Sequence, residues 1–137
     1  MEGRGEPEDG APSGAGSEAD QGALTQQISD EVARLYKHDF GKGPLEARTY
    51  LQPDLVVVVL SGGYTASEQT LFDAGKWYEV RQARQHWQDS MKVRFIDKIE
   101  GLTGRNVKAF MSANTQDPDL AVELFVLHTD QEQNAPA

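Results

Sequence analysis

Residues 53–60 read Pro-Asp-Leu-Val-Val-Val-Val-Leu, and residues 118–127 read Pro-Asp-Leu-Ala-Val-Glu-Leu-Phe-Val-Leu. In each stretch a turn-forming Pro-Asp pair precedes an apolar run, and a helical pattern lies earlier in the chain. This repetition predicts two helix-plus-hairpin units, in which the strand after the turn is the more buried of its pair. A second repetition agrees: Arg34, Leu35 and Gly41 lie 60 positions before Arg94, Phe95 and Gly101.

The apolar run from Leu55 to Leu60 does not alternate with polar residues. Successive side chains of a strand point to opposite faces of the sheet, so its four consecutive valines require cover on both faces. The helices of two small units would cover one face. A loop, a partner or a second copy must cover the other, and we expect a homodimer.

Apolar side chains at helical spacing predict a first helix over about 22–39 and a long second helix over about 76–100. Strands are expected at 45–51 and 107–112, and the polar residues 114–118 are expected to form the second turn.

The expected fold class is α+β. Duplicated helix-plus-β-hairpin units form a four-stranded, mainly antiparallel sheet, with strands 55–60 and 120–127 in the centre and the helices packed on one face. Residues 1–20 contain no Leu, Ile, Val or aromatic residue and are expected to be a disordered acidic tail. Residues 21–130 are expected to form a single domain, and residues 131–137 a frayed C-terminus.

The composition excludes several classes of function. The chain of 137 residues has 22 acidic and 13 basic residues and a formal charge of -9, which opposes binding to nucleic acid or to anionic lipid. Its longest apolar run has six residues, too few to span a bilayer, so direct membrane insertion is not expected. The chain contains no cysteine, and no secretory signal is apparent. We expect a cytoplasmic protein.

Motifs for chemistry are not apparent. The three histidines, His38, His86 and His128, lack partners at metal-ligand spacing, and no serine lies in a Gly-x-Ser-x-Gly motif. We therefore expect no metal, no cofactor and no enzymatic activity.

One arginine in the second predicted helix is unusual. Arg84 shares a helix face with the apolar Val80 and Trp87, where a charge needs a partner. Two interpretations remain open. Arg84 either extends along a tryptophan or pairs internally with a carboxylate such as Glu46 or Asp54, or else it forms an anion or partner site with Arg81 and Arg48.

Several short motifs together resemble the MpsC-like domain family, formerly a domain of unknown function. They are Gly41-Lys42-Gly43-Pro44, Tyr50-Leu51, the run from Asp54 to Leu60, Thr65-x-x-Glu68, Val80-Arg81-x-x-Arg84, Arg94, Leu102-Thr103-Gly104 and Phe125-Val126-Leu127. The resemblance covers about residues 22–129. The chain departs from the family in the third strand, where a common Ser-Asp pair is replaced by Ser112-Ala113.

The resemblance implies a small accessory or regulatory subunit of a sodium-translocating system that generates membrane potential. On this basis we expect a non-enzymatic protein that acts through protein contacts, that has a membrane transporter subunit as its partner, and that lies peripheral to the membrane through that partner. The alternative is a small-ligand or anion-binding domain, or an enzyme, that uses Arg48, Arg81 and Arg84.

Overall fold

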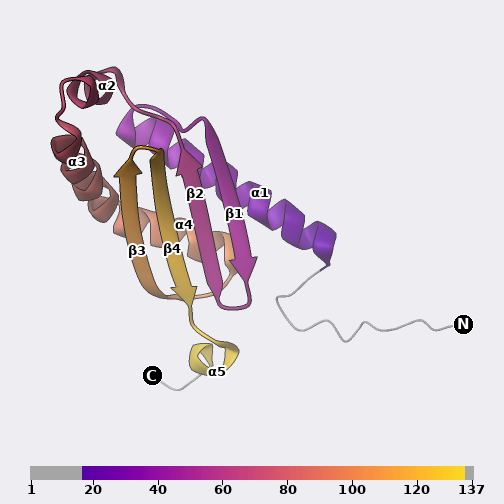
Figure 1. Ribbon diagram of the computed structural model, residues 1–137. Coiled ribbons are helices and arrows are strands. Elements are labelled where there is room, and N and C mark those ends of the chain that lie inside the picture. Colours follow the sequence, from indigo (N-terminus) through magenta and orange to yellow (C-terminus); the bar gives the residue numbers. More distant parts are fainter. Residues whose placement is uncertain (1–16, 135–137) are drawn as a thin grey trace, which may run out of the picture.

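The computed structural model describes residues 17–134 of the chain. Within these residues, helices and strands follow one another as drawn in Figure 1. Their order is α1 (Glu18–Leu35), the π-helical turn η1 (Tyr36–Phe40), β1 (Glu46–Gln52), β2 (Leu55–Ser61), α2 (Ala66–Asp73), α3 (Trp77–Ser90), α4 (Lys92–Thr103), β3 (Val107–Gln116), β4 (Asp119–Leu127) and α5 (Asp130–Gln133).

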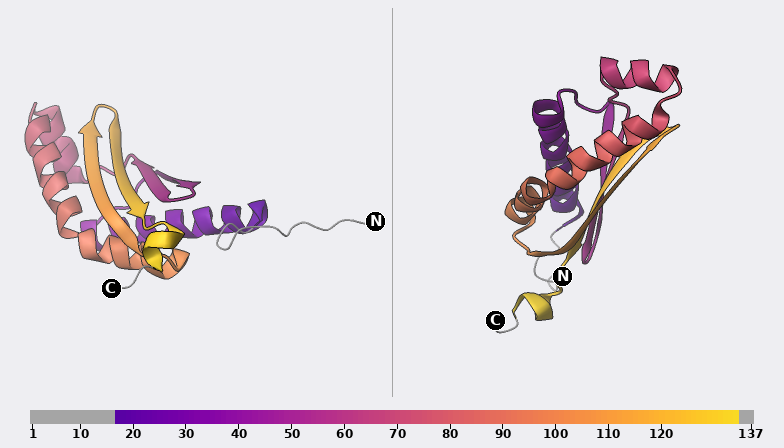
Figure 2. Two further views of the ribbon diagram at one scale, coloured as in Figure 1. Left: turned by 90° about the horizontal axis from the view of Figure 1, so that it is seen from below. Right: turned by 90° about the vertical axis from the view of Figure 1, so that its left-hand side faces the viewer.

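The four strands form one antiparallel sheet in the order β1-β2-β4-β3. Each hairpin contributes its apolar strand to the centre, where Val57 lies opposite Leu124 and Val59 opposite Val122. When the sheet is viewed along its edge, α1, α3 and α4 lie on one side of it (Figure 2). The predicted α+β class, the central pair of strands and the one-sided packing of the helices are confirmed.

The core lies between the sheet and these helices. Val56, Val58 and Leu60 of β2 are buried, whereas the intervening Val57 and Val59 are only partly covered. Side chains at helical spacing on α1 and α4 pack onto this face of the sheet. The core cluster on this face includes Ile28, Val32, Phe95, Ile99 and Phe125.

The prediction of one long helix over 76–100 was wrong, because α3 and α4 meet in a bend at Met91. Met91 has φ −88° and ψ 1°, so its ψ lies outside the helical range. Its buried side chain remains part of the core, and an apolar pattern therefore continues through the bend. The bend allows α3 to lie along β3 while α4 also contacts α1.

The predicted boundaries at both ends also need correction. Helix α1 begins at Glu18, inside the segment 1–20 that was expected to be a tail, because Ser17 forms a capping box with Asp20. Residues 1–16 lie outside the described residues. At the other end, where fraying was expected over 131–137, the short α5 is capped by Thr129. Residues 135–137 again lie outside the described residues.

Strand β3 is longer than predicted. The residues expected to begin the turn, Asn114 to Gln116, instead pair with β4, and the turn is made by Asp117 and Pro118. Their polar composition is typical of a turn, which explains the error. This extension of β3 carries Asn114 and Gln116 into the helix-covered side of the sheet, where both are buried.

The sheet face away from the helices, here called the open face, is largely apolar. No described helix packs across it (Figure 2). The strand register places these side chains on it: Glu46, Arg48, Tyr50 and Gln52 of β1, Leu55, Val57, Val59 and Ser61 of β2, Ala109, Met111, Ala113 and Thr115 of β3, and Leu120, Val122, Leu124 and Val126 of β4.

Among residues 17–134, no helix combines the length and the apolar character that crossing a membrane requires.

Candidate functional site

A connected set of polar side chains, here called the polar layer, lies between the helices and the sheet. Its members are Tyr36, Tyr64, Glu68, Arg84, Gln88, Ser112, Asn114, Gln116, Asp119 and Glu123. Most of these side chains are buried. Buried polar groups destabilise a fold unless they are hydrogen-bonded, so the partners of each group are informative.

Glu123 lies on β4 between the buried Ala121 and Phe125, and it is 0% exposed. Its carboxylate accepts hydrogen bonds from Tyr36 Oη at 2.5 Å, Ser112 Oγ at 2.5 Å and Gln88 Nε2 at 2.7 Å. None of the ion pairs formed within residues 17–134 involves this carboxylate. Glu123 is therefore a buried acid that is solvated by neutral donors alone.

This environment favours the protonated form of Glu123. Burial raises its pKa to about 7, and the hydrogen bonds from Ser112, Tyr36 and Gln88 oppose the increase only in part. Burial and the nearby Glu123 charge also raise the pKa of Tyr36 well above its ordinary value, so Tyr36 remains protonated. The polar layer thus contains one acid that exchanges its proton near neutral pH.

Arg84 forms a second buried centre with the opposite electrostatic character. Its guanidinium contacts Glu68 Oε1 at 2.9 Å and Asp119 Oδ1 at 2.8 Å, and its side chain is 2% exposed. Its Cζ atom lies 5.3 Å from the ring centroid of Phe40 and 5.2 Å from that of Tyr64. Burial by itself lowers the pKa of Arg84, but Glu68 and Asp119 together raise it, so the guanidinium stays charged.

Side-chain amides connect the two centres. From the Glu123 side, Asn114 Nδ2 donates to Gln88 Oε1 at 3.1 Å, and Gln116 Nε2 donates to Asn114 Oδ1. Tyr64 Oη, beside Arg84, donates to Gln116 Oε1 at 3.1 Å. Each of these amides is held at both its nitrogen and its oxygen, so their orientations are fixed by their neighbours.

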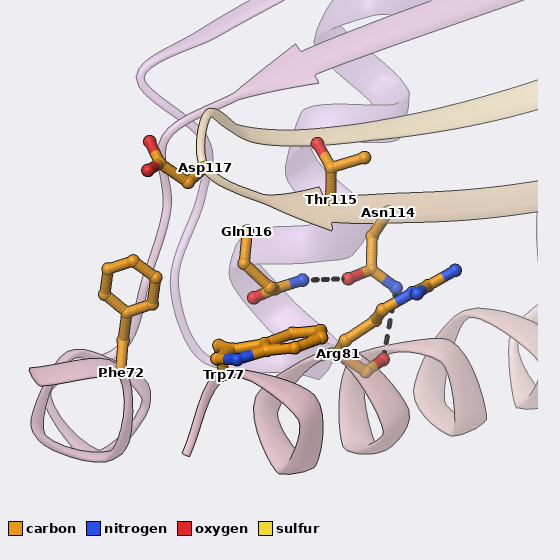
Figure 3. Close-up of a pocket in the computed structure, with 7 residues that line it drawn as sticks. All are labelled: Phe72, Trp77, Arg81, Asn114, Thr115, Gln116 and Asp117. Atoms are coloured by element: carbon orange, nitrogen blue, oxygen red, sulfur yellow. Dashed lines mark hydrogen bonds between the residues drawn. The ribbon is translucent and has the colours of Figure 1, made fainter. Parts of the chain in front are cut away.

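A pocket of about 470 Å³ opens between the amide chain and the N-terminal half of α3 (Figure 3). It is lined by Phe72, Trp77, Arg81, Asn114, Thr115, Gln116 and Asp117. Trp77 is 50% exposed. No hydrogen bond or ion pair from the Arg81 guanidinium occurs within the described part of the chain.

The three arginines proposed from the sequence occupy three different environments. Arg81 borders the pocket, whereas Arg84 is buried with Glu68 and Asp119 rather than with Glu46 or Asp54. Arg48 lies on the open face, where its Nη2 pairs with Glu46 at 3.0 Å. The fold does not bring Arg48 to the other two, and a binding role for any of them remains a prediction.

Sequence analysis missed the Glu123 centre. Its signal was present, because Glu123 interrupts an apolar strand at a position that shares the inward face with Ala121 and Phe125. Its three donors come from η1, α3 and β3, and their convergence depends on tertiary structure. No cluster of three or more histidine, aspartate or glutamate side chains within residues 17–134 is placed to hold a metal ion.

Comparisons with known proteins support the family resemblance that the sequence motifs indicate. The uncharacterized protein YbcI of Bacillus subtilis (strain 168) is 25% identical over 115 residues, which cover 83% of this chain and 93% of that protein. No solved structure matches the chain. The sequence pattern of the family described as "Na+-translocating membrane potential-generating system (MpsC)" matches residues 20–129, and the chain therefore belongs to this family.

Proposed function

We propose that the chain is a non-enzymatic accessory or regulatory protein that acts through protein contacts on a membrane ion-translocating system. Membership of the MpsC family supports the link to such a system. The observation that supports a role through protein contacts, beginning with self-association, is the open face, an apolar surface that the described helices leave uncovered. The proposed location is cytoplasmic and peripheral to the membrane, through a protein partner.

The open face is suited to a permanent contact. Its two charged side chains, Arg48 and Glu46, pair with each other, although the whole chain has a formal charge of -9. Four strands about 4.8 Å apart, with about seven residues each at about 3.3 Å per residue, give roughly 450 Å² of planar area. A patch of this size falls within the roughly 300–600 Å² of the largest exposed patch on a typical monomer, which is often a functional surface.

The proposed occupant of the open face is a second copy of the chain. A two-fold axis through the sheet would place the central strands β2 and β4 of one copy against those of the other, burying Val57 and Leu124. Contacts from the surrounding loops would bring the buried area toward the roughly 800 Å² per partner of a stable interface. The homodimer is then the unit that contacts the transport system.

Light scattering tests the dimer directly. The unsubstituted chain should have the mass of a dimer at micromolar concentration, and Val57→Glu should have that of a monomer, because it places a charge in the centre of the contact. Val93→Glu is a matched control, since Val93 is 67% exposed on α4, away from the open face. A monomeric mass for the unsubstituted chain contradicts the homodimer.

A voltage-sensitive dye tests the cellular role. Removal of the protein from its host should change the membrane potential, and the unsubstituted chain and Val93→Glu should restore it, whereas Val57→Glu should not. Affinity purification should recover a membrane ion-transport protein with the same two chains. The proposed function fails if the potential is unchanged and no such membrane protein is recovered.

Ligand binding by the arginine-bearing helix is a second candidate function. The observation that favours it is the pocket beside Arg81, whose guanidinium has no ion-pair partner within residues 17–134. An anion that pairs with Arg81 should raise the thermal unfolding midpoint, by an amount that grows with the logarithm of its concentration once that exceeds the dissociation constant.

A further inference from the structure

Ser112 differs from the other two donors to Glu123 in its access to solvent. Gln88 is 0% exposed and Tyr36 is 4% exposed, whereas Ser112, on the edge strand β3, is only half-buried. Ser112 also lines a pocket of about 420 Å³. Among the described residues, the Ser112 hydroxyl is therefore the one donor to Glu123 that borders a solvent-filled hollow.

This pocket lies between the edge strand β3 and the bend that joins α3 to α4. Its lining residues are Asp89, Lys92, Phe110, Met111 and Ser112, of which Asp89, Lys92 and Met111 are exposed. Ser112 Oγ lies 2.5 Å from Glu123 Oε1, to which it donates a hydrogen bond. One hydroxyl group thus separates the buried carboxyl from the pocket.

The other two donors end inside the core. Gln88 donates through an amide nitrogen, which has donor hydrogens only and cannot take up a proton in exchange. Tyr36 has a hydroxyl group, but its ring is packed against three aromatic rings, those of Phe40, Trp87 and Phe95. Neither donor connects the Glu123 carboxyl to solvent.

The fold supplies no free cation for Glu123 within residues 17–134. The buried side chains of α1, β1, β2, β3 and α4 are uncharged, and Tyr36 of η1 is a neutral hydroxyl. On α3, Arg84 is already paired with two carboxylates, and the charge of Asp89 disfavours the Glu123 anion further. A proton is therefore the group that neutralises this carboxylate in the folded protein.

We infer that Glu123 binds and releases a proton while the fold stays closed, and that the proton passes between this carboxyl and the pocket through the Ser112 hydroxyl. In uptake, hydronium or a buffer acid in the pocket gives a proton to Ser112 Oγ as the original hydroxyl proton moves to Glu123 Oε1. Ser112 ends neutral with one proton, the acid has lost one, and release is the reverse.

The geometry assigns the transferred proton to Oε1. Glu123 Oε2 already accepts hydrogen bonds from Tyr36 and Gln88, whereas Oε1 accepts one from Ser112. A hydroxyl group donates one hydrogen bond and accepts up to two, so Ser112 can turn its own proton toward the pocket when Oε1 is protonated. This inference goes beyond the proposed function and depends neither on the open face nor on Arg81.

Carbon-13 NMR of the full chain, labelled at the glutamate carboxyl carbons, measures both occupancy and rate. Burial raises the pKa of Glu123 to about 7, so both of its forms are present near neutral pH. One carboxyl signal should titrate there, well above the pKa of about 4.3 of an ordinary glutamate, and it should be missing from Glu123→Gln. Its line shape through the titration gives the rate constant for protonation.

Three variants test the route. Ser112→Ala removes the hydroxyl and should lower the rate constant for protonation about tenfold, the kinetic equivalent of one lost hydrogen bond. Tyr36→Phe is the matched control, because it also removes a hydroxyl donor and raises the pKa of Glu123 but should leave this rate constant unchanged. Ser112→Thr retains a hydroxyl group and should retain the rate.

Three results would overturn the inference. Without a glutamate signal that titrates near neutral pH, Glu123 is not a proton-binding site. An unchanged rate constant in Ser112→Ala excludes the route through the hydroxyl. A protonation rate equal to the opening rate of α3, measured by amide hydrogen exchange, would mean that the proton enters when the fold opens. None of these results affects the proposed dimer, whose test is molecular mass.

Discussion

The two helix-and-hairpin halves of the molecule present different side chains to the same core. In the first half, α1, β1 and β2 contribute apolar residues such as Ile28, Val56 and Val58, with one buried hydroxyl pair, Ser29 and Thr49, at 2.8 Å. In the second half, β3 presents the polar Ser112, Asn114 and Gln116 to the core, and β4 presents Glu123 between Ala121 and Phe125. The strands of both halves pair in the same way.

This difference distinguishes the apolar contacts that the architecture needs from the buried polar groups that the second half contains in addition. In the first half, mainly apolar contacts hold the helix onto its hairpin. The second half holds buried charges, which commonly stabilise a protein less than apolar residues of the same volume. We therefore expect the effect of a substitution on the free energy of unfolding to depend on its bonding partners and on pH in the polar layer. In the first half, the effect should depend on the buried volume that is removed.

The largest effect is expected at Arg84. Arg84→Met leaves Glu68 and Asp119 facing each other without a cation, and the free energy of unfolding should fall by about 3–5 kcal/mol. Urea unfolding measures this loss. Arg81→Met, on the exposed side of the same helix, is the control and should change stability by less than about 0.5 kcal/mol.

A companion variant examines the cause. Adding Glu68→Gln and Asp119→Asn to Arg84→Met removes the stranded charges and should recover part of the lost stability. A triple variant that is no more stable than Arg84→Met would show that lost packing, rather than unpaired charge, explains the effect.

The next effect is a pH dependence at Glu123. Its pKa is raised from 4.5 to about 7 in the folded protein, so folding favours the protonated carboxyl. The stability it contributes is fully present below about pH 4.5 and is lost as the pH rises through about 7. Glu123→Gln should remove roughly 3 kcal/mol of this loss, because glutamine stays neutral.

Urea unfolding of the unsubstituted chain and of Glu123→Gln between about pH 4.5 and 7 checks the prediction. The variant should gain stability relative to the unsubstituted chain as the pH rises, and the two curves should become parallel above the folded pKa. Equal slopes for the two chains would mean that Glu123 ionises in the folded protein over the same pH range as in the unfolded chain, so that burial does not raise its pKa.

A smaller effect is expected in the apolar half, from two neighbouring valines of β2. Val58 is completely buried, and Val58→Ala should lower the free energy of unfolding by about 2 kcal/mol through lost burial and a residual cavity. Val59→Ala, on the open face, should cost less than about 1 kcal/mol in the isolated monomer. A larger loss for Val59, measured at dimer-forming concentration, would show that the open face is covered in solution.

The sequence predicts the architecture well for a physical reason. The fold class, the central pair of strands and the packing of the helices on one face all follow from where apolar residues recur, and burial of those residues drives the fold. The bend at Met91 was not predicted, because its buried side chain maintains the apolar pattern on both sides. The length of β3 was not predicted, because Asn114 to Gln116 have the composition of a turn.

The site was less predictable, since its members depend on contacts between distant residues. Arg84 was recognisable as a charge on an apolar face, but its partners Glu68 and Asp119 lie 16 and 35 positions away. Glu123 receives a hydrogen bond from Tyr36, 87 positions earlier in the chain. Local spacing identifies a buried polar residue, and the fold determines which group satisfies it.

The smallest effect is expected at Glu132, a second glutamate of the same half, whose pKa is lowered whereas that of Glu123 is raised. Glu132 lies exposed on α5, and the hydrogen bond from Lys108, together with the N–H of Thr129, lowers its pKa from 4.5 to about 2. Its contribution is therefore present above about pH 4.5 and is lost as the pH falls toward 2.

Glu132→Gln should accelerate amide hydrogen exchange in α5 at neutral pH without shifting global unfolding, because the affected contacts are solvent-exposed and local. High salt should reduce the difference in exchange between the two chains, whereas it should leave the Glu123 pH dependence largely intact, since buried groups are screened much less. Exchange that is unchanged by the substitution at low salt would show that the ion pair with Lys108 does not hold α5 in place. The two glutamates together then distinguish burial, which raises a carboxyl pKa, from pairing, which lowers it.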